Sequence, residues 1–227
     1  MINFLRKFFR KDRKEKPDDE EQEKYAIGDW LLFLQTYNQE LLNTDEVRKS
    51  VPVEVLESGW MGNPGATEEQ IQAAEDRLGI QFSPSFREFY KITNGWRGAG
   101  YYTDAVFPFE ILPVEKVEWF QTNNQDWIDI YNQKPSEVSD KDYFVYGKKQ
   151  SSVVFRQEYL KTALQISTDH DAGVYLLNPK IVFEDGEWEA WQFTDWMPGA
   201  QRHKSFLQLM VDERSSFLML LERSLET

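Results

Sequence analysis

The stretch from Ala66 to Trp96 limits the possible folds most, because helix start and stop signals agree there with the hydrophobic spacing. In its first half, Thr67 is expected to cap a helix, with Gln70 three residues later completing a capping box. Gly79 is expected to end this helix in the left-handed conformation. Its buried face at helical spacing is predicted to be Ile71, Ala74, Glu75 and Leu78.

The second half of the stretch predicts a second helix after a short extended link. Ser83 is a suitable N-cap and Pro84 a suitable first helical residue. Asn94 and Gly95 tolerate left-handed geometry and are expected to end the helix. Its apolar side is predicted to be Phe86, Phe89 and Tyr90. Two consecutive helices are therefore the firmest local prediction.

Glu75 is the acidic member of an otherwise apolar helix face. An unpaired buried carboxylate is costly, so the side chain must find donors. We expect it to accept from backbone amides near Asn94–Gly98, or to pair with an arginine. This is a structural role, in preference to a catalytic one.

The pattern resembles the opening of the SUKH superfamily, which includes the fungal Smi and Knr cell-wall regulators. The resemblance is carried by Glu75, Leu78, Gly79, Pro84, Phe86, Phe89, Asn94 and Gly95. Trp60, Gly62 and Gly65 resemble the family's lead-in, and Tyr175–Asn178, Glu187–Trp196 and Ser205-Phe206 its closing strands and last helix, so the likeness covers Gly59 to Leu221. It implies an α+β fold and a binding role, since bacterial members are mostly immunity proteins that neutralise a cognate toxin.

The composition argues against several classes of function. The 227 residues contain no cysteine, which excludes disulfides, thiolate metal sites and a cysteine nucleophile and suits a cytoplasmic protein. The net charge of −13 argues against direct nucleic-acid binding and favours attraction of a basic partner. Acidity without a specific role is the alternative interpretation.

Residues 1–24 are expected to form a charged, flexible N-terminal segment. Within residues 1–13, apolar and basic side chains fall on different helical faces, as in helices that bind weakly to an anionic membrane surface. The alternatives are a disordered tail, or a helix docked on the acidic body of the protein. The expected location is cytoplasmic, with peripheral membrane contact as an option.

The remaining chain divides into a helical extension, 25–58, and a SUKH-like domain, 59–227. In the extension, we expect a helix over Tyr25–Leu42 and a shorter one over Asp45–Ser58, interrupted near Pro52. The expected fold class is α+β, a single mostly antiparallel sheet covered on one side by helices. Arg97–Gly100 and Trp196–Arg202 are expected to be loops. Strands are predicted over Tyr101–Ile111, Asp142–Tyr146, Val153–Phe155, Leu164–Ser167, Val174–Leu177, Lys180–Glu184 and Trp188–Thr194, and helices over Pro113–Tyr131 and His203–Leu225.

Only one segment has the composition of a catalytic or metal site. Asp169-His170-Asp171 places an imidazole between two carboxylates, and the other histidine is His203. Adjacent loop residues rarely converge on one ion, and no zinc-protease or phosphate-loop spacing is present. We therefore predict a turn, with no catalytic residue, metal or cofactor.

A hairpin around Asp185-Gly186 is the predicted partner-contact region. Carboxylates attract a basic protein and aromatic side chains anchor interfaces. In the second strand Glu189, Trp191 and Phe193 should share one face, with Trp188 and Ala190 on the other. The predicted partner-binding residues are Glu184, Asp185, Glu187, Trp188, Glu189, Trp191, Asp169 and Asp171. A sheet with one core face and a solvated turn is the structural alternative.

These features favour a non-catalytic binding protein. The SUKH resemblance implies an immunity protein that occludes a cognate toxin, expected to be basic and to act on nucleic acid. The alternatives are a regulatory or scaffold protein at the membrane surface or in cell-wall signalling, and a metal-dependent hydrolase using Asp169, His170 and His203. The sequence does not predict the oligomeric state.

Overall fold

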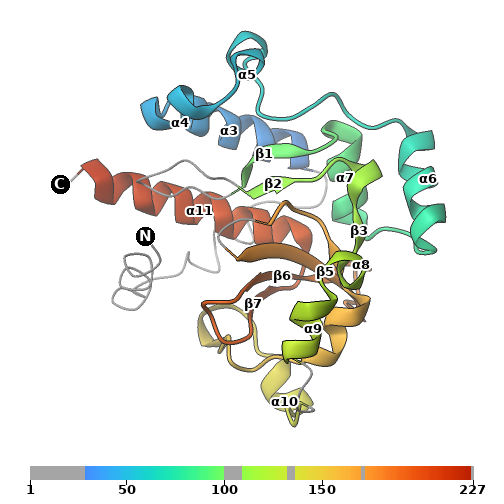
Figure 1. The fold of residues 1–227 in the computed structure, drawn as a ribbon. Helices are drawn as coiled ribbons and strands as arrows, with labels where there is room; N and C mark the ends of the chain where they lie inside the picture. Colours follow the sequence, from blue (N-terminus) through green and yellow to red (C-terminus); the bar gives the residue numbers. More distant parts are fainter. Residues whose placement is uncertain (1–28, 100–108, 132–135, 170–171, 226–227) are drawn as a thin grey trace.

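A computed structural model describes residues 29–99, 109–131, 136–169 and 172–225 (Figure 1). The predicted N-terminal segment 1–24 and its membrane contact lie outside the described residues, as do His170 and Asp171. The predicted strand over Tyr101–Ile111 is described only from Phe109 onward.

The extension forms three helices, α3 (Trp30–Leu42), α4 (Asp45–Ser50) and α5 (Val53–Ser58). The prediction of a helix ending at Leu42 is confirmed for its described part, as is the interruption near Pro52. Helix α3 is not an appendage. Its buried aromatic residues Trp30, Phe33 and Tyr37 belong to the main hydrophobic core.

The two helices predicted most firmly are α6 (Glu68–Leu78) and α7 (Pro84–Ile92). The capping box is present: the Gln70 amide donates to Thr67 Oγ1 at 3.3 Å, and the Thr67 amide donates to Gln70 Oε1 at 2.8 Å. Gly79 ends α6 with φ of 69°, a conformation that glycine adopts without a steric cost. Local chemistry therefore fixes this part of the fold.

A five-stranded antiparallel sheet forms the centre of the molecule, with strand order β3-β4-β5-β6-β7. Its strands are β3 (Glu118–Trp119), β4 (Leu164–Gln165), β5 (Gly173–Val182), β6 (Trp188–Thr194) and β7 (Ala200–His203). A separate two-stranded sheet pairs β1 (Trp96–Ala99) with β2 (Phe109–Ile111), and a bridge from Ile111 to Ser167 connects the two. The long helix α11 (Phe206–Leu225) follows. The α+β class is confirmed.

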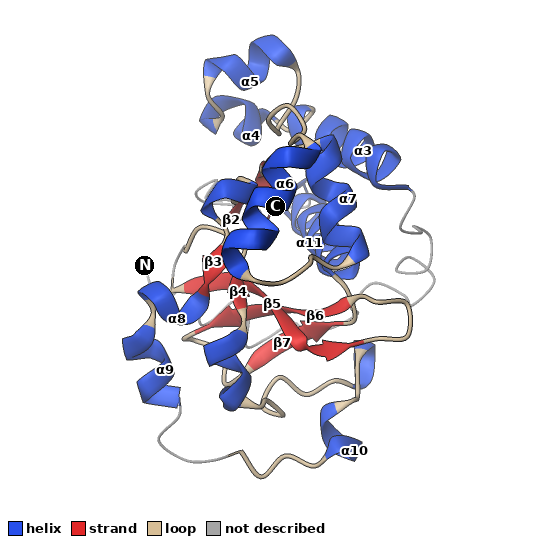
Figure 2. Cartoon of the chain, turned by 90° about the vertical axis from the view of Figure 1, so that its right-hand side faces the viewer, coloured by secondary structure: helices blue, strands red, loops and turns tan. Residues whose placement is uncertain are grey.

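Both faces of the large sheet are covered, so the expectation of cover on one side was wrong. Figure 2 shows α3, α7 and α11 on one side of the sheet and α8 and α9 on the other. Trp188 and Ala190 belong to the main core, whereas Trp191 and Phe193 belong to a second cluster on the opposite face. The predicted alternation along β6 is confirmed, and both of its faces are interior.

The single helix predicted over Pro113–Tyr131 is instead four short elements. They are η2 (Val114–Lys116), β3, α8 (Phe120–Asn123) and α9 (Gln125–Tyr131). A long-range contact overrides the helical pattern, because β3 pairs with β4 and the Phe120 amide donates to the Ala163 carbonyl at 2.8 Å. Pairing across the sheet thus breaks a segment whose local spacing favours a helix.

Four other predictions were wrong. The segment predicted as a strand over Asp142–Tyr146 begins as helix α10 (Asp140–Tyr143), because Ser139 accepts a capping bond from the Asp142 amide. Val153–Phe155 is not a strand, and η3 (Gly147–Lys149) and η4 (Gln157–Thr162) flank it. The loops expected over Arg97–Gly100 and Trp196–Arg202 instead contribute residues to β1 and β7.

Side chains from other segments hydrogen-bond to edge strand β7 and to the residue just before edge strand β3. The Gln150 side-chain amide accepts from the Arg202 amide at 2.7 Å and donates to the Arg202 carbonyl at 2.6 Å, as a neighbouring strand would. Gly199 has φ of 83°, and a Cβ there would lie 1.9 Å from the Ser152 carbonyl oxygen, so close approach requires glycine. At the other edge, Arg77 donates to the Val117 carbonyl at 2.7 Å.

Candidate partner-binding site

The predicted hairpin around Asp185-Gly186 is present and connects β5 to β6. Val182 pairs with Trp188 across the two strands. The turn is closed by the Phe183 amide, which donates to the Glu187 carbonyl at 2.8 Å. The four carboxylates that the sequence places near this turn have different environments, and these decide what each can do.

Glu187 is buried and binds the N-terminus of α7. Its carboxylate accepts from the Ser85 amide at 2.6 Å and from the Ser85 hydroxyl. The N-cap residue Ser83 makes no side-chain capping bond, so Glu187 performs that task from 102 residues away. Burial raises the pKa of Glu187, and the hydrogen bonds from Ser85 oppose that rise. This carboxylate fastens the hairpin to α7.

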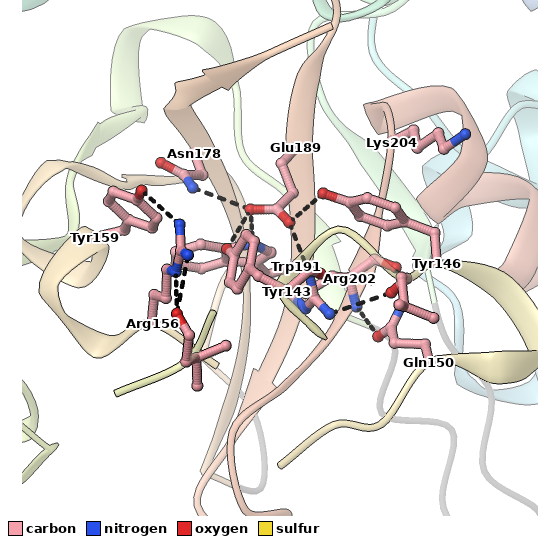
Figure 3. Close-up of polar contacts among 12 residues, drawn as sticks. Tyr143, Tyr146, Gln150, Arg156, Tyr159, Asn178, Glu189, Trp191, Arg202 and Lys204 are labelled. Atoms are coloured by element: carbon pink, nitrogen blue, oxygen red, sulfur yellow. Dashed lines mark hydrogen bonds and ion pairs between the residues drawn. The ribbon is translucent and has the colours of Figure 1, made fainter. Parts of the chain in front are cut away.

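Glu189 is the centre of a buried polar cluster (Figure 3). One carboxylate oxygen accepts from Tyr143 at 2.7 Å, Trp191 at 2.8 Å and Asn178 at 3.0 Å. The other accepts from Tyr146 at 2.8 Å and pairs with the Arg202 guanidinium at 3.3 Å. We call this cluster the Glu189 network; its members are Tyr143, Tyr146, Asn178, Glu189, Trp191 and Arg202.

The Glu189 network holds the segment Tyr143–Tyr146 against β6 and β7. Burial raises the pKa of the Tyr143 and Tyr146 phenols, and the Glu189 charge raises it further, so both stay protonated as donors. The Arg202 guanidinium carbon lies 4.2 Å from the Tyr143 ring centroid, within cation–π range. Arg202 also donates to the carbonyls of Tyr143 and Val145. The contacts of Arg202 therefore give it a structural role, which is to hold the segment Tyr143–Tyr146 in place.

Four of the expected partner-binding residues lie in the interior. Glu187, Trp188, Glu189 and Trp191 are at most 5% exposed, so as folded they present no contact surface. The physical reason is the cover on both faces of the sheet. Trp191, for example, packs at 5.0 Å between ring centroids against Phe155. Their identification as partner contacts is corrected on this ground.

Glu184 and Asp185 remain exposed at the turn, beside aromatic residues that the sequence analysis did not select. The Phe183 and Tyr146 rings meet at 5.6 Å and both are partly exposed, and Val182 is 57% exposed. We call this group the hairpin surface; it consists of Tyr146, Val182, Phe183, Glu184 and Asp185. The position of Val182 and Phe183 directly before the turn was a sequence signal that could have identified them. Tyr146 had no such signal, because it comes from a distant segment.

The two aspartates expected to join this site do not lie with the hairpin turn. Asp169 is exposed in the loop before β5, at the opposite end of that ten-residue strand. At a rise of ~3.3 Å per residue, the two ends are roughly 30 Å apart. Asp171 lies outside the described residues. The eight predicted residues therefore do not form one surface.

The described residues do not bring the hydrolase candidates together. Asp169 is exposed, whereas His203 is buried and pairs with Ala190 across the sheet. Within the described ranges, no group of three histidines, aspartates or glutamates is placed to hold a metal ion. No helix in this part of the chain has the length and apolarity needed to cross a membrane.

The residues that carry the family resemblance have structural contacts. Glu75 accepts from the Phe82 amide at 2.8 Å and pairs with Arg87 at 3.2 Å, which confirms the expected arginine partner. The amide donor is Phe82, not one of the residues 94–98. Asn94 accepts from the Val114 amide at 2.7 Å and thereby joins the end of α7 to η2.

A comparison with protein families gives one result and a comparison with curated proteins gives none. A search of the curated proteins found no match to the chain. The family model that matches residues 65–211 is that of the SMI1 / KNR4 family (SUKH-1). The matched region begins just before α6 and ends within α11, and it contains the complete five-stranded sheet. Because the match covers more than half of its length, the chain belongs to the SMI1 / KNR4 family (SUKH-1).

Proposed function

We propose that this protein is a non-catalytic binding protein, and specifically an immunity protein that neutralises a cognate toxin by occluding it. Membership of the SUKH-1 family supports this proposal, because bacterial members of the superfamily are mostly binding and immunity domains. The net charge of −13 also supports it. Such a charge attracts a basic protein at long range and speeds the encounter between the two.

The observation that carries the proposal is the construction of the hairpin surface. Tyr146 is partly exposed, yet its hydroxyl donates at 2.8 Å to the buried Glu189 carboxylate. The aromatic surface beside Glu184 and Asp185 is thus held in place before any partner arrives. Pre-organised aromatic residues lose little conformational entropy on binding, and such residues anchor many protein interfaces.

In the proposed mechanism, the toxin is blocked by steric cover and by charge. Glu184 and Asp185 would pair with lysine or arginine residues at the rim of the toxin's active cleft. A toxin that acts on nucleic acid needs such cations to hold phosphate groups. Occupying them with carboxylates would exclude the substrate without any chemical step.

Capture of the natural partner tests the function. The full chain, tagged, is expected to retain the product of the neighbouring upstream gene at one-to-one stoichiometry, and co-expression is expected to abolish that product's toxicity. A neighbouring product that is expressed, yet neither binds nor is neutralised, would contradict the proposal.

The proposed contact site needs a separate test. The double variant Glu184→Lys/Asp185→Lys is expected to bind the captured toxin about tenfold more weakly, because two attractive charges become repulsive. Glu54→Lys/Glu57→Lys is the control, since both side chains are exposed on α5 and the change in net charge is the same. Equal weakening by the two variants would remove the hairpin surface from the proposal.

Contact of residues 1–13 with an anionic membrane remains a second part of the proposal. Such contact would keep an immunity protein where a toxin enters the cell. Deletion of residues 1–13 is expected to abolish flotation with anionic liposomes and to leave toxin binding unchanged. Flotation that is independent of these residues would exclude this part.

A further inference from the structure

Helix α9 covers the second face of the sheet with one side only. Ile128, on the inner side of α9, is fully buried. The rings of Trp127 and Tyr131 pack on Phe193 of β6, at centroid distances of 5.4 and 5.0 Å. These contacts fix the orientation of the helix and of both aromatic side chains.

The other side of α9 faces solvent and combines apolar with acidic groups. Ile130 is 61% exposed, and Trp127 and Tyr131 remain partly exposed although their rings contact Phe193. Asp126 and Asp129 are exposed one helical turn apart. Exposed apolar surface of Ile130 therefore lies on the same short helix as two exposed carboxylates and two partly exposed aromatic rings.

The turn after β6 adds a third carboxylate to this surface. Asp195 is exposed, and its amide donates to the Ala172 carbonyl at 2.9 Å, which fixes the turn. Asp195 comes two residues after Phe193, on which the Tyr131 ring packs at 5.0 Å. Burial raises the pKa of Tyr131, and the Asp195 charge raises it further. We call this group the α9 surface; it consists of Asp126, Trp127, Asp129, Ile130, Tyr131 and Asp195.

The sequence of these two segments contains no compensating cation. Neither α9, QDWIDIY, nor residues 195–199, DWMPG, includes lysine or arginine. The α9 surface therefore combines a charge of −3 with aromatic rings that are held in place. Arginine and lysine can interact with both kinds of group. Their charged ends pair with carboxylates, and their aliphatic stems and cation–π contacts pack on aromatic rings.

We propose that the α9 surface docks a lysine- and arginine-rich segment of a protein partner. Charge complementarity selects this occupant. Phosphate backbones, anionic membranes and a second copy of this acidic chain would all be repelled. The site is distinct from the hairpin surface, because Asp195 follows β6 at the end of the hairpin opposite the turn.

The test uses a fluorescently labelled nona-arginine peptide and the full chain, measured by fluorescence anisotropy at low and at physiological salt. Asp126→Lys/Asp129→Lys is expected to lower the affinity about tenfold at low salt. Glu54→Lys/Glu57→Lys is the matched control, because this pair has the same spacing and is exposed on another short helix. The control is expected to change the affinity by less than about twofold.

Equal losses in the two double variants would overturn the inference, because net charge alone would then explain binding. Failure of the wild-type chain to bind the peptide would also overturn it. As a variant without a charge change, Ile130→Ala is expected to weaken binding about threefold, while wild-type affinity would exclude an apolar contribution. Thermal melts establish that each variant is folded. The inference is independent of toxin neutralisation, so either can fail while the other stands.

Discussion

The carboxylates of the β5–β6 hairpin have two opposite environments. At the closed end, Glu187 and Glu189 on the strand side of the turn are buried and hydrogen-bonded, whereas Glu184 and Asp185 in the turn itself are exposed. At the open end, Asp169 and Asp195 are exposed in the loops that flank the two strands. The sequence is acidic in both places, so composition alone does not distinguish them.

The difference follows from the donors that each end meets. Glu187 meets the N-terminus of α7, and Glu189 meets Arg202 together with two phenols. These donors offset the free energy needed to remove a carboxylate from water. Carboxylates without such donors stay at the surface and give the molecule its external field. In this protein, the buried acids Glu187 and Glu189 hold segments of the fold together, and the exposed acids give the surface its negative charge.

The largest expected effect comes from neutralising the centre of the closed end. Glu189→Gln leaves the Arg202 cation buried and sets an amide NH₂ group against existing donors, so we expect a loss of about 3–5 kcal/mol in the free energy of unfolding. That loss corresponds to roughly 10 °C in melting temperature. Urea and thermal unfolding measure it. Glu184→Gln, on the exposed side of the turn, is the control and is expected to melt as wild type.

A smaller loss is expected from the second buried carboxylate. Glu187→Ala removes the acceptor for the Ser85 amide and hydroxyl, with an expected cost of about 2 kcal/mol. Hydrogen exchange should increase first in the opening turn of α7. Exchange that increases uniformly over the chain would argue against a local capping role for Glu187.

Glu213 on α11 is another buried carboxylate, and it extends the comparison to the effect of pH. Burial raises its pKa from 4.5 to about 8; the Tyr175 hydroxyl opposes this rise and the Asp212 charge adds to it. The folded state therefore holds a proton that the unfolded chain releases near pH 4.5. The stabilisation is complete below about pH 4.5 and is lost as pH rises to about 8.

Replacement of Glu213 should remove this pH dependence. Glu213→Gln is expected to gain stability relative to wild type as pH rises from 5 to 8, by about 1 kcal/mol or more at the upper end. Melting curves of both proteins over this pH range provide the measurement. A difference in melting temperature that does not vary with pH would mean that Glu213 does not titrate there.

The smallest effect is expected at the open end. Asp195→Asn should change the free energy of unfolding by less than about 0.5 kcal/mol, because the side chain is exposed and its backbone amide, not its carboxylate, bonds to Ala172. A loss similar to that of Glu189→Gln would erase the distinction between the two ends. Chemical denaturation resolves the two cases.

The parts of the fold that the sequence predicts well are those with local signals. The capping box of α6, Gly79 and Pro84 act within a few residues, and the structure has helices where they predict them. The segment 113–131 has helical spacing, but its pairing with Leu164 and Gln165 lies about 45 positions away. A pattern within one segment cannot report such a contact.

The candidate site shows the same limit. Glu184 and Asp185 are exposed as predicted, because a tight turn leaves its central residues in solvent. Burial of Glu189 depends on Tyr143, Tyr146 and Arg202, which come from separate segments. One signal was available: Glu189 shares a strand face with Trp191 and Phe193, and a carboxylate in such a row requires internal partners.

The side-chain amide of Gln150 has a consequence for behaviour at high concentration. It occupies the hydrogen-bonding groups of Arg202 on strand β7, where another molecule's strand would otherwise pair. Arg77 has the same effect on the carbonyl of Val117, beside β3. At these positions the protein's own side chains occupy backbone groups that a strand of another molecule would need, which disfavours edge-to-edge pairing there.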